Sequence, residues 1–170
     1  MESTKRFEEF QKNVIGWAED KGIYAFSTPL AQALKAVSEA GELADASIKG
    51  DIDGIKDAIG DVAVCLVNFG KMVDVEFLPM HNCNFQPCPK SHYLSKPQGS
   101  AAYVSSMVAD IANLTAKNRV NNYWGGVMQP LIFAAMANNL DFLDCCESAW
   151  LEIKDRKGRM VEGGAFVKDE

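Results

Sequence analysis

The residues best suited to chemistry are carboxylates in two short clusters. Glu39 and Glu42 are three residues apart, and Asp57 and Asp61 are four residues apart. On a helix, either spacing places both side chains on one face. Two carboxylate pairs brought together by neighbouring helices would form an all-oxygen cluster, which Mg²⁺ and Mn²⁺ prefer. The sequence therefore predicts a Mg²⁺ or Mn²⁺ site whose ligands are Glu39, Glu42, Asp57 and Asp61.

Asp61 carries the strongest physical argument for this site. It lies in an almost continuously apolar stretch, in which Asp57 and Asn68 share its side of a helix. A buried carboxylate must be protonated, hydrogen-bonded, paired with a base or bound to a metal. A buried ion pair between Asp61 and Lys35 or an arginine is the alternative that remains open. The glutamate pair by itself also fits an ordinary solvated helix face.

A metal at this position would hold phosphate oxygens and lower the pKa of an attacking water, while a spare carboxylate accepts the proton. We expect Glu39, Glu42 and Asp61 to be the catalytic residues. Other side chains are candidates for substrate contacts. They are polar neighbours of the acids, lysines that can meet phosphate as point charges, and a tryptophan whose ring can stack on a base. These candidates are Gln32, Lys35, Asn68, Trp17 and Lys154. For Lys154, a solvated helix end is the alternative.

Three helices must position these residues. The first is predicted from Thr4 to Asp20, because apolar residues recur at helical spacing and Gly22 follows. The second begins with Thr28 as N-cap and Pro29 in the first turn, and it ends at Lys49 and Gly50. Its predicted core face is Leu30, Leu34, Val37, Gly41, Ala44 and Ile48. The third is capped by Asp51 or Asp53 and extends to about Val73 as a buried helix.

The second half of the chain is predicted to add three helices, at about 101–119, from near Trp124, and at about 141–157. A tail that folds back through Phe166 and Val167 follows, and no segment shows a useful strand period. Residues 74–100 form a loop-rich insertion. Four possible zinc ligands lie in it, and the alternative is an ordinary loop. They are His81, Cys83, Cys88 and His92.

Composition limits the function classes. With 170 residues, 48% of them hydrophobic, the chain fits one soluble domain, 1–170, built as an all-α bundle of about five to six helices. A net charge of -6 argues against nucleic-acid binding. The longest apolar run holds polar and charged residues, so no membrane span is expected. The five cysteines suggest no disulfide framework, which favours a reducing cytoplasm.

Several motifs together resemble the MazG-like all-α nucleoside triphosphate pyrophosphohydrolases. Ser38-Glu39-Ala40-Gly41-Glu42-Leu43 is similar to the Glu-x-x-Glu half of the family signature. Ala58-Ile59-Gly60-Asp61-Val62 resembles the Glu-x-x-Asp half, with alanine in place of its first acid. The segments Trp17–Ile23, Gln32–Lys35 and Trp150–Met160 are similar to phage-encoded members. Asp57, one residue before Ala58, is the expected substitute for the missing acid.

The resemblance implies a four-helix core completed by oligomerisation, as a dimer or tetramer. It also implies Mg²⁺-dependent hydrolysis of a (deoxy)nucleoside triphosphate between the α and β phosphates, giving a monophosphate and pyrophosphate. The family's substrates include (d)GTP, and a phage-encoded member would work in the host cytoplasm. Because of Ala58, the alternative is a helical nucleotide-sensing or protein-interaction module that has lost turnover.

Overall fold

The structure is a computed structural model that describes residues 2–75, 89–119, 127–162 and 166–167. These residues form seven α-helices, which confirms the all-α prediction. The one-turn helix α2 was not predicted. The elements are α1 (Glu2–Asp20), α2 (Ile23–Phe26), α3 (Pro29–Lys49), α4 (Ile52–Val73), the 3₁₀ turn η2 (Tyr93–Ser95), α5 (Pro97–Ala116), α6 (Gln129–Ala137), α7 (Phe142–Ile153), β1 (Arg159–Met160) and β2 (Phe166–Val167).

Helices α3 and α4 form an antiparallel hairpin whose ends are fixed by local chemistry. The Thr28 hydroxyl accepts a hydrogen bond from the Ala31 N–H at 3.1 Å and caps α3. Gly50 ends α3 with φ of 69°, a left-handed conformation that glycine adopts without strain. Asp51 then caps α4 by accepting from the Gly54 N–H at 3.1 Å. Both predicted helix starts are therefore confirmed.

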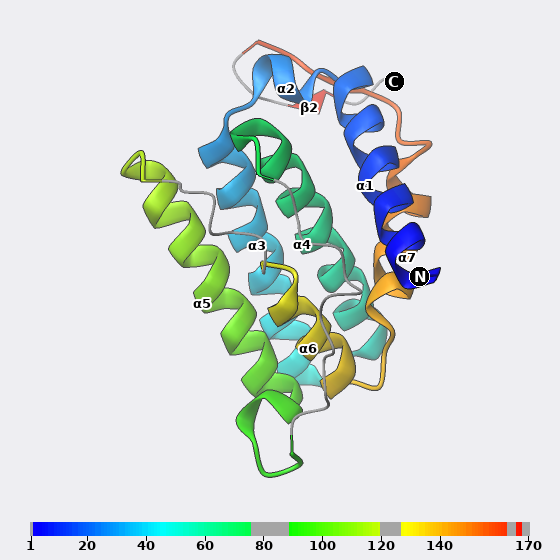
Figure 1. The fold of residues 1–170 in the computed structure, drawn as a ribbon, viewed down its shortest axis with the longest axis vertical. Coiled ribbons are helices and arrows are strands. Elements are labelled where there is room, and N and C mark those ends of the chain that lie inside the picture. Colours follow the sequence, from blue (N-terminus) through cyan, green and yellow to red (C-terminus); the bar gives the residue numbers. More distant parts are fainter. Residues whose placement is uncertain (1, 76–88, 120–126, 163–165, 168–170) are drawn as a thin grey trace.

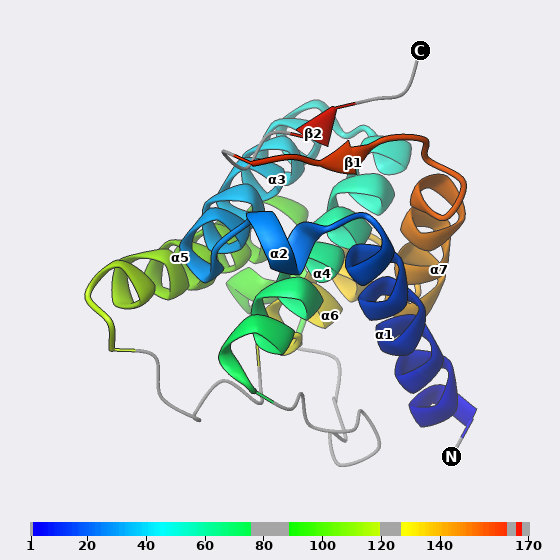
Figure 2. The same cartoon turned by 90° about the horizontal axis from the view of Figure 1, so that it is seen from above.

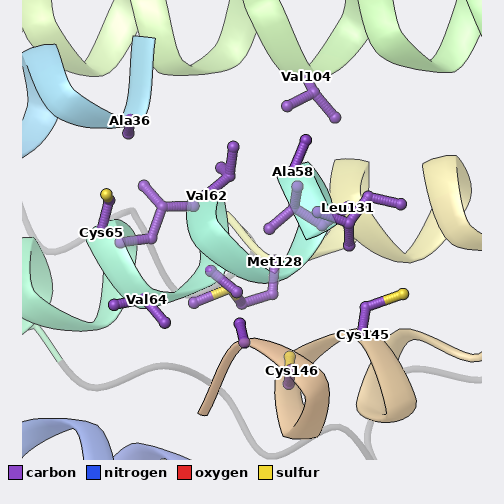
Figure 3. Close-up of a cluster of buried hydrophobic side chains, with 14 of the residues drawn as sticks. Ala36, Ala58, Val62, Val64, Cys65, Val104, Met128, Leu131, Cys145 and Cys146 are labelled. Atoms are coloured by element: carbon purple, nitrogen blue, oxygen red, sulfur yellow. The ribbon is translucent and has the colours of Figure 1, made fainter. Parts of the chain in front are cut away.

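Helix α4 is the centre of the molecule. Helices α3 and α5 lie on one side of it and α1 and α7 on the other (Figures 1 and 2). Figure 3 shows α4 side chains, including Val62, between Val104 above and Cys146 below, with Leu131 beside Ala58. All of these side chains are buried, which confirms the predicted buried helix.

Helices α4 and α7 approach each other closely at Gly60. A Cβ atom added to Gly60 would lie 2.5 Å from the Cys145 carbonyl oxygen and 2.6 Å from the Ala149 Cβ. Only glycine fits there without a shift of the backbone. The contact therefore fixes how α7 sits against the helix that carries Asp61.

The predicted core face of α3 is wrong. Leu34 is 55% exposed and Ile48 is 72% exposed, and Gly41 is exposed as well. The residues that pack inward are mainly small, namely Ala33, Ala36, Ala40, Leu43 and Ala46. Small side chains allow α3 to pack closely against α4 and α5, so the larger residues lie on the outer side.

The other helices of the second half lie near their predicted ranges, although Trp124, the predicted start of one of them, lies outside the described residues and α6 begins at Gln129. Helix α5 begins at Pro97, four residues before the predicted start, and α7 ends at Ile153 rather than near Lys157. The tail folds back as predicted, although it does so as an unpredicted two-stranded hairpin in which Arg159 pairs with Val167. The Met160 N–H donates to the Lys21 carbonyl at 2.8 Å, which attaches the hairpin to the end of α1.

Two other expectations concern the loop segment and the membrane. Among the four predicted zinc ligands, His81, Cys83 and Cys88 lie outside the described residues. His92 is described, and its Nδ1 accepts a hydrogen bond from the Leu94 N–H at 3.3 Å, where it caps η2. Within the described ranges, no helix has the length and hydrophobicity needed to cross a bilayer.

Candidate functional site

A cavity of about 540 Å³ lies beside the α3–α4 hairpin. The end of α1, Arg156 after α7 and the C-terminal hairpin complete its wall. Most of the predicted site residues line it, namely Trp17, Gln32, Lys35, Glu39, Glu42, Asp61 and Asn68. Asp57 and Lys154 are not among its lining residues.

The polar residues of the cavity are ordered along the hairpin. Because α3 and α4 run in opposite directions, the turn that holds Gln32 lies beside the turn that holds Asn68. Glu39 lies beside Asp61 in the same way. From Gln32 to Glu42 the helix rises roughly 15 Å at 1.5 Å per residue. The cavity thus has an acidic end, with Glu39, Glu42 and Asp61, and an amide end, with Gln32 and Asn68.

At the acidic end, the environment of Asp61 disfavours its charged form. Burial is the largest cause, followed by the negative charges of Glu39, Asp57 and Glu152, and together they raise the pKa of Asp61 to about 7. The positive charge of Arg156 acts in the opposite direction without cancelling the rise. Asp61 is therefore a carboxylate whose negative charge the protein leaves uncompensated.

Glu39 is the most buried acid of the cluster, with 4% of its surface exposed. Its carboxylate forms an ion pair with the exposed Lys35 one turn earlier on α3. This contact is the main cause that raises the pKa of Lys35. The cation considered as a partner for Asp61 thus pairs with Glu39 in this structure.

The region of Asp57 explains the alanine at position 58. Ala58 is 4% exposed and lies in the core beside Leu131 and Val104 (Figure 3), so an acid there would have to be buried among apolar side chains. Asp57 lines a shallower hollow that shares Glu42 with the main cavity. Its pKa is raised by burial first, then by the charge of Glu152 and a hydrogen bond between the two carboxyl groups.

Two further residues belong to the acidic end, namely Glu152, which sequence reasoning did not single out, and Arg156, which lies in the charged helix end around Lys154. Glu152 of α7 contacts Asp57, and Arg156 lines the cavity and donates a hydrogen bond to Glu152 at 2.8 Å. Lys154 between them is exposed. The usable signal was the four-residue spacing of Glu152 and Arg156, which places them together on one side of the α7 end. The packing of α7 against α4 at this point belongs to the tertiary structure, which residue spacing does not predict.

The amide end is neutral and internally hydrogen-bonded. Asn68 is 2% exposed, and its Oδ1 accepts a hydrogen bond from the Tyr24 hydroxyl at 2.9 Å. Gln32 is 8% exposed, and its Nε2 donates to the Ser27 hydroxyl oxygen at 3.0 Å. Trp17 borders both residues in the cavity. Neither Tyr24 nor Ser27 was predicted, because each acts through a side chain from another part of the chain.

The acidic end fits a divalent cation by its chemistry. In the described part of the chain, no three Asp, Glu, His or Cys side chains already converge as a metal-binding group. The donors are nevertheless all carboxylate oxygens, as Mg²⁺ prefers, and burial followed by their mutual repulsion raises the pKa values of Asp57 and Asp61. A cation would relieve that repulsion and allow the oxygens to converge.

The fold and this site define an all-α protein with a carboxylate-lined cavity, and comparison with known proteins adds one relative. No family model matches the chain, and no solved structure matches it. An uncharacterized 18.2 kDa protein from the rep-hol intergenic region of Haemophilus phage HP1 (strain HP1c1) is 38% identical over 69 residues. The match spans 41% of this chain and 42% of the phage protein. This chain is therefore similar in part to a phage protein.

Proposed function

We propose that the protein is a metal-dependent nucleoside triphosphate pyrophosphohydrolase that cleaves a (d)NTP, such as (d)GTP, between the α and β phosphates. The observation that carries the proposal is the two-ended cavity, in which three carboxylates are followed by two neutral amides and Trp17. Its volume of about 540 Å³ lies in the range of small-molecule sites. The resemblance of the acidic motifs to MazG-like enzymes supports the same activity.

In this proposal, the metal ligands come from Glu39, Glu42 and Asp61, with Asp57 in place of the acid missing at Ala58. When bound, Mg²⁺ or Mn²⁺ would supply a Lewis acid for phosphate oxygens and lower the pKa of the attacking water. Before metal arrives, Lys35 offsets the charge of the buried Glu39. Once a metal neutralises Glu39, Lys35 becomes free to meet the triphosphate as a point charge.

The reaction itself needs one proton acceptor and charge balance for the leaving group. The water oxygen forms a bond to the α phosphorus, and the bond from that phosphorus to the bridging oxygen breaks. Pyrophosphate leaves with the electron pair, and the proton of the water passes to a carboxylate oxygen of the cluster that is not used as a ligand. Arg156, which lines the same end, is placed to contact the departing phosphates.

We further propose that the working form is a homo-oligomer, a dimer or tetramer, in the cytoplasm, and in the host cytoplasm if the chain is phage-encoded. The support is the outer face of α3, where Leu34 and Ile48 are exposed on either side of Gly41. Exposed apolar side chains in a row are typical of contact surfaces. The molar mass in solution by light scattering tests this, and a monomer at micromolar concentration would contradict it.

Turnover tests the proposed activity. Purified protein is incubated with a panel of NTPs and dNTPs, with and without Mg²⁺ or Mn²⁺, and the products are separated by ion-exchange chromatography. We expect metal-dependent release of a monophosphate and pyrophosphate. Diphosphate and phosphate as products would contradict the cleavage position. Nucleotide binding without any turnover would favour the alternative of a nucleotide-sensing module.

A further inference from the structure

The amide end holds two polar atoms whose hydrogen-bonding capacity is unused. Asn68 engages its carbonyl oxygen with Tyr24, and its amide nitrogen has no partner among the described residues. Gln32 engages its amide nitrogen with Ser27, and its carbonyl oxygen has no partner there either. Both side chains are more than nine-tenths buried and line the same cavity. Neither of these two atoms belongs to the fully buried, unpartnered atoms of the described residues, so both are open to the cavity, where a ligand or a water can pair with them.

Trp17 adds an aromatic wall to the same cavity, which it lines together with both amides. Its indole Nε1 is fully buried, is not open to the cavity, and has no hydrogen-bond partner among the described residues. The remaining walls here are apolar and include Ile23, Met160 and Phe166. A ligand for this end is therefore a flat group with an apolar face and a polar edge, and it carries no charge.

Building on the proposed function, we propose that the amide end selects among nucleotides by reading the hydrogen-bonding edge of the base. Asn68 offers N–H donors and Gln32 offers a carbonyl acceptor, so the complementary edge presents an acceptor beside a donor. Tyr24 and Ser27 are positioning residues, because each holds one amide in the orientation that exposes its other group.

Tyr24 is suited to that task because its hydroxyl remains a donor. Burial, and to a lesser extent the charge of Glu19, raise the pKa of Tyr24 well above its ordinary value. A protonated hydroxyl requires an acceptor, and Asn68 can satisfy it only through its carbonyl oxygen. Without Tyr24, the Asn68 amide could turn over and present either group to the base.

Discrimination by such a pair is strong because a wrong base leaves buried groups unpaired. A site built to hydrogen-bond a substrate group rejects an analogue that lacks it by about four to five orders of magnitude at the upper end. A single pair of amides that can partly rearrange discriminates less, and each mismatched hydrogen bond weakens binding by roughly five- to a hundredfold. We therefore expect a preference of at least about tenfold for one base.

The test is calorimetric binding of the α,β-imido analogues of dATP, dGTP, dCTP and dTTP in the presence of Mg²⁺. We expect the wild type to prefer one base, and Tyr24→Phe to lose most of that preference. Ser27→Ala should also weaken the preference for that base. Because Ser27 is partly exposed, this change does not put the fold at risk. Asn68→Asp replaces the donors with acceptors, and affinity for the preferred base should fall at least about tenfold.

Two controls separate this proposal from the proposed function. Tyr103→Phe, in α5 and away from the cavity lining, should leave the preference unchanged. Binding of Mg²⁺-tripolyphosphate, which has no base, should be the same in wild type, Tyr24→Phe and Ser27→Ala. Equal wild-type affinity for all four analogues would overturn the proposed recognition of the base and leave the proposed function standing. An unchanged preference in Tyr24→Phe and Asn68→Asp would do the same. Failure of the wild type to bind any analogue or tripolyphosphate would overturn the proposed function as well.

Discussion

The two ends of the cavity show opposite ways of burying polar groups. At the acidic end, burial of Asp61 and then the negative charges of Glu39, Asp57 and Glu152 raise the pKa of Asp61 to about 7. At the amide end, each buried amide already has one hydrogen-bonding partner. The acidic end therefore destabilises the metal-free protein, whereas the amide end is preorganised. This difference is what the proposed metal site requires, because a bound cation would relieve the repulsion among the acids.

The largest expected effect separates catalysis from stability at Asp61. Asp61→Asn should lower kcat/KM by about a thousandfold or more, because it removes a ligand charge with little change in volume. The same variant should raise the thermal midpoint of the metal-free protein, because it removes a repelled buried charge. Steady-state kinetics and calorimetric melting are the measurements. Asp53→Asn, exposed in the first turn of α4, is the matched control and should change neither.

Gly60→Ala tests whether the contact of α4 with α7 holds the acidic end together. The added methyl group meets the Cys145 carbonyl and the Ala149 side chain, so the helices must separate. We expect a loss of about 1–3 kcal/mol in the free energy of unfolding, measured in urea. Gly16→Ala in α1, where no atom lies within 4 Å of the added carbon, should instead be neutral or stabilising. Equal effects of the two changes would contradict the close approach.

The pH dependence of stability should show the repulsion directly. In the native metal-free protein Asp61 has a pKa of about 7, against an ordinary value of 3.8, so the native state keeps a proton that the unfolded state has released. The contribution of Asp61 to the free energy of unfolding is therefore most favourable below about pH 4, and it falls as the pH rises towards 7. Urea unfolding at a series of pH values checks this. The fall should be smaller in Asp61→Asn, and a rise of stability with pH would count against the assignment.

The smallest expected effect comes from a buried polar group outside the cavity. The Ser47 hydroxyl is buried and has no hydrogen-bond partner among the described residues. Since no ligand can reach it from the cavity, Ser47→Ala should stabilise the protein by about 1 kcal/mol and leave kcat/KM unchanged. Urea unfolding measures the first and steady-state kinetics the second. A destabilised variant would show that the hydroxyl is satisfied in solution, for example by water.

The sequence predicted the buried helix α4 and the place of Asp61 on its polar stripe, because one polar stripe on an apolar helix has few interpretations. It failed for the face of α3, where alanines pack inward and Leu34 and Ile48 stay outside. Hydrophobicity alone cannot show that close helix packing favours small side chains. Glu152 and Tyr24 were missed for a different reason. Each reaches the site through the packing of another element, and no local pattern around them records that packing.

The proposed metal site can be tested most directly by titrating the protein with Mn²⁺ and following free Mn²⁺ by electron paramagnetic resonance. The account predicts that the wild type removes Mn²⁺ from solution, and that Asp61→Asn and Glu39→Gln lose this binding while Asp53→Asn retains it. Addition of an α,β-imido dNTP should tighten the wild-type binding beyond that of the nucleotide alone. A free Mn²⁺ signal that the wild type leaves unchanged, or that the Asp61 and Glu39 variants lower equally well, would contradict the account.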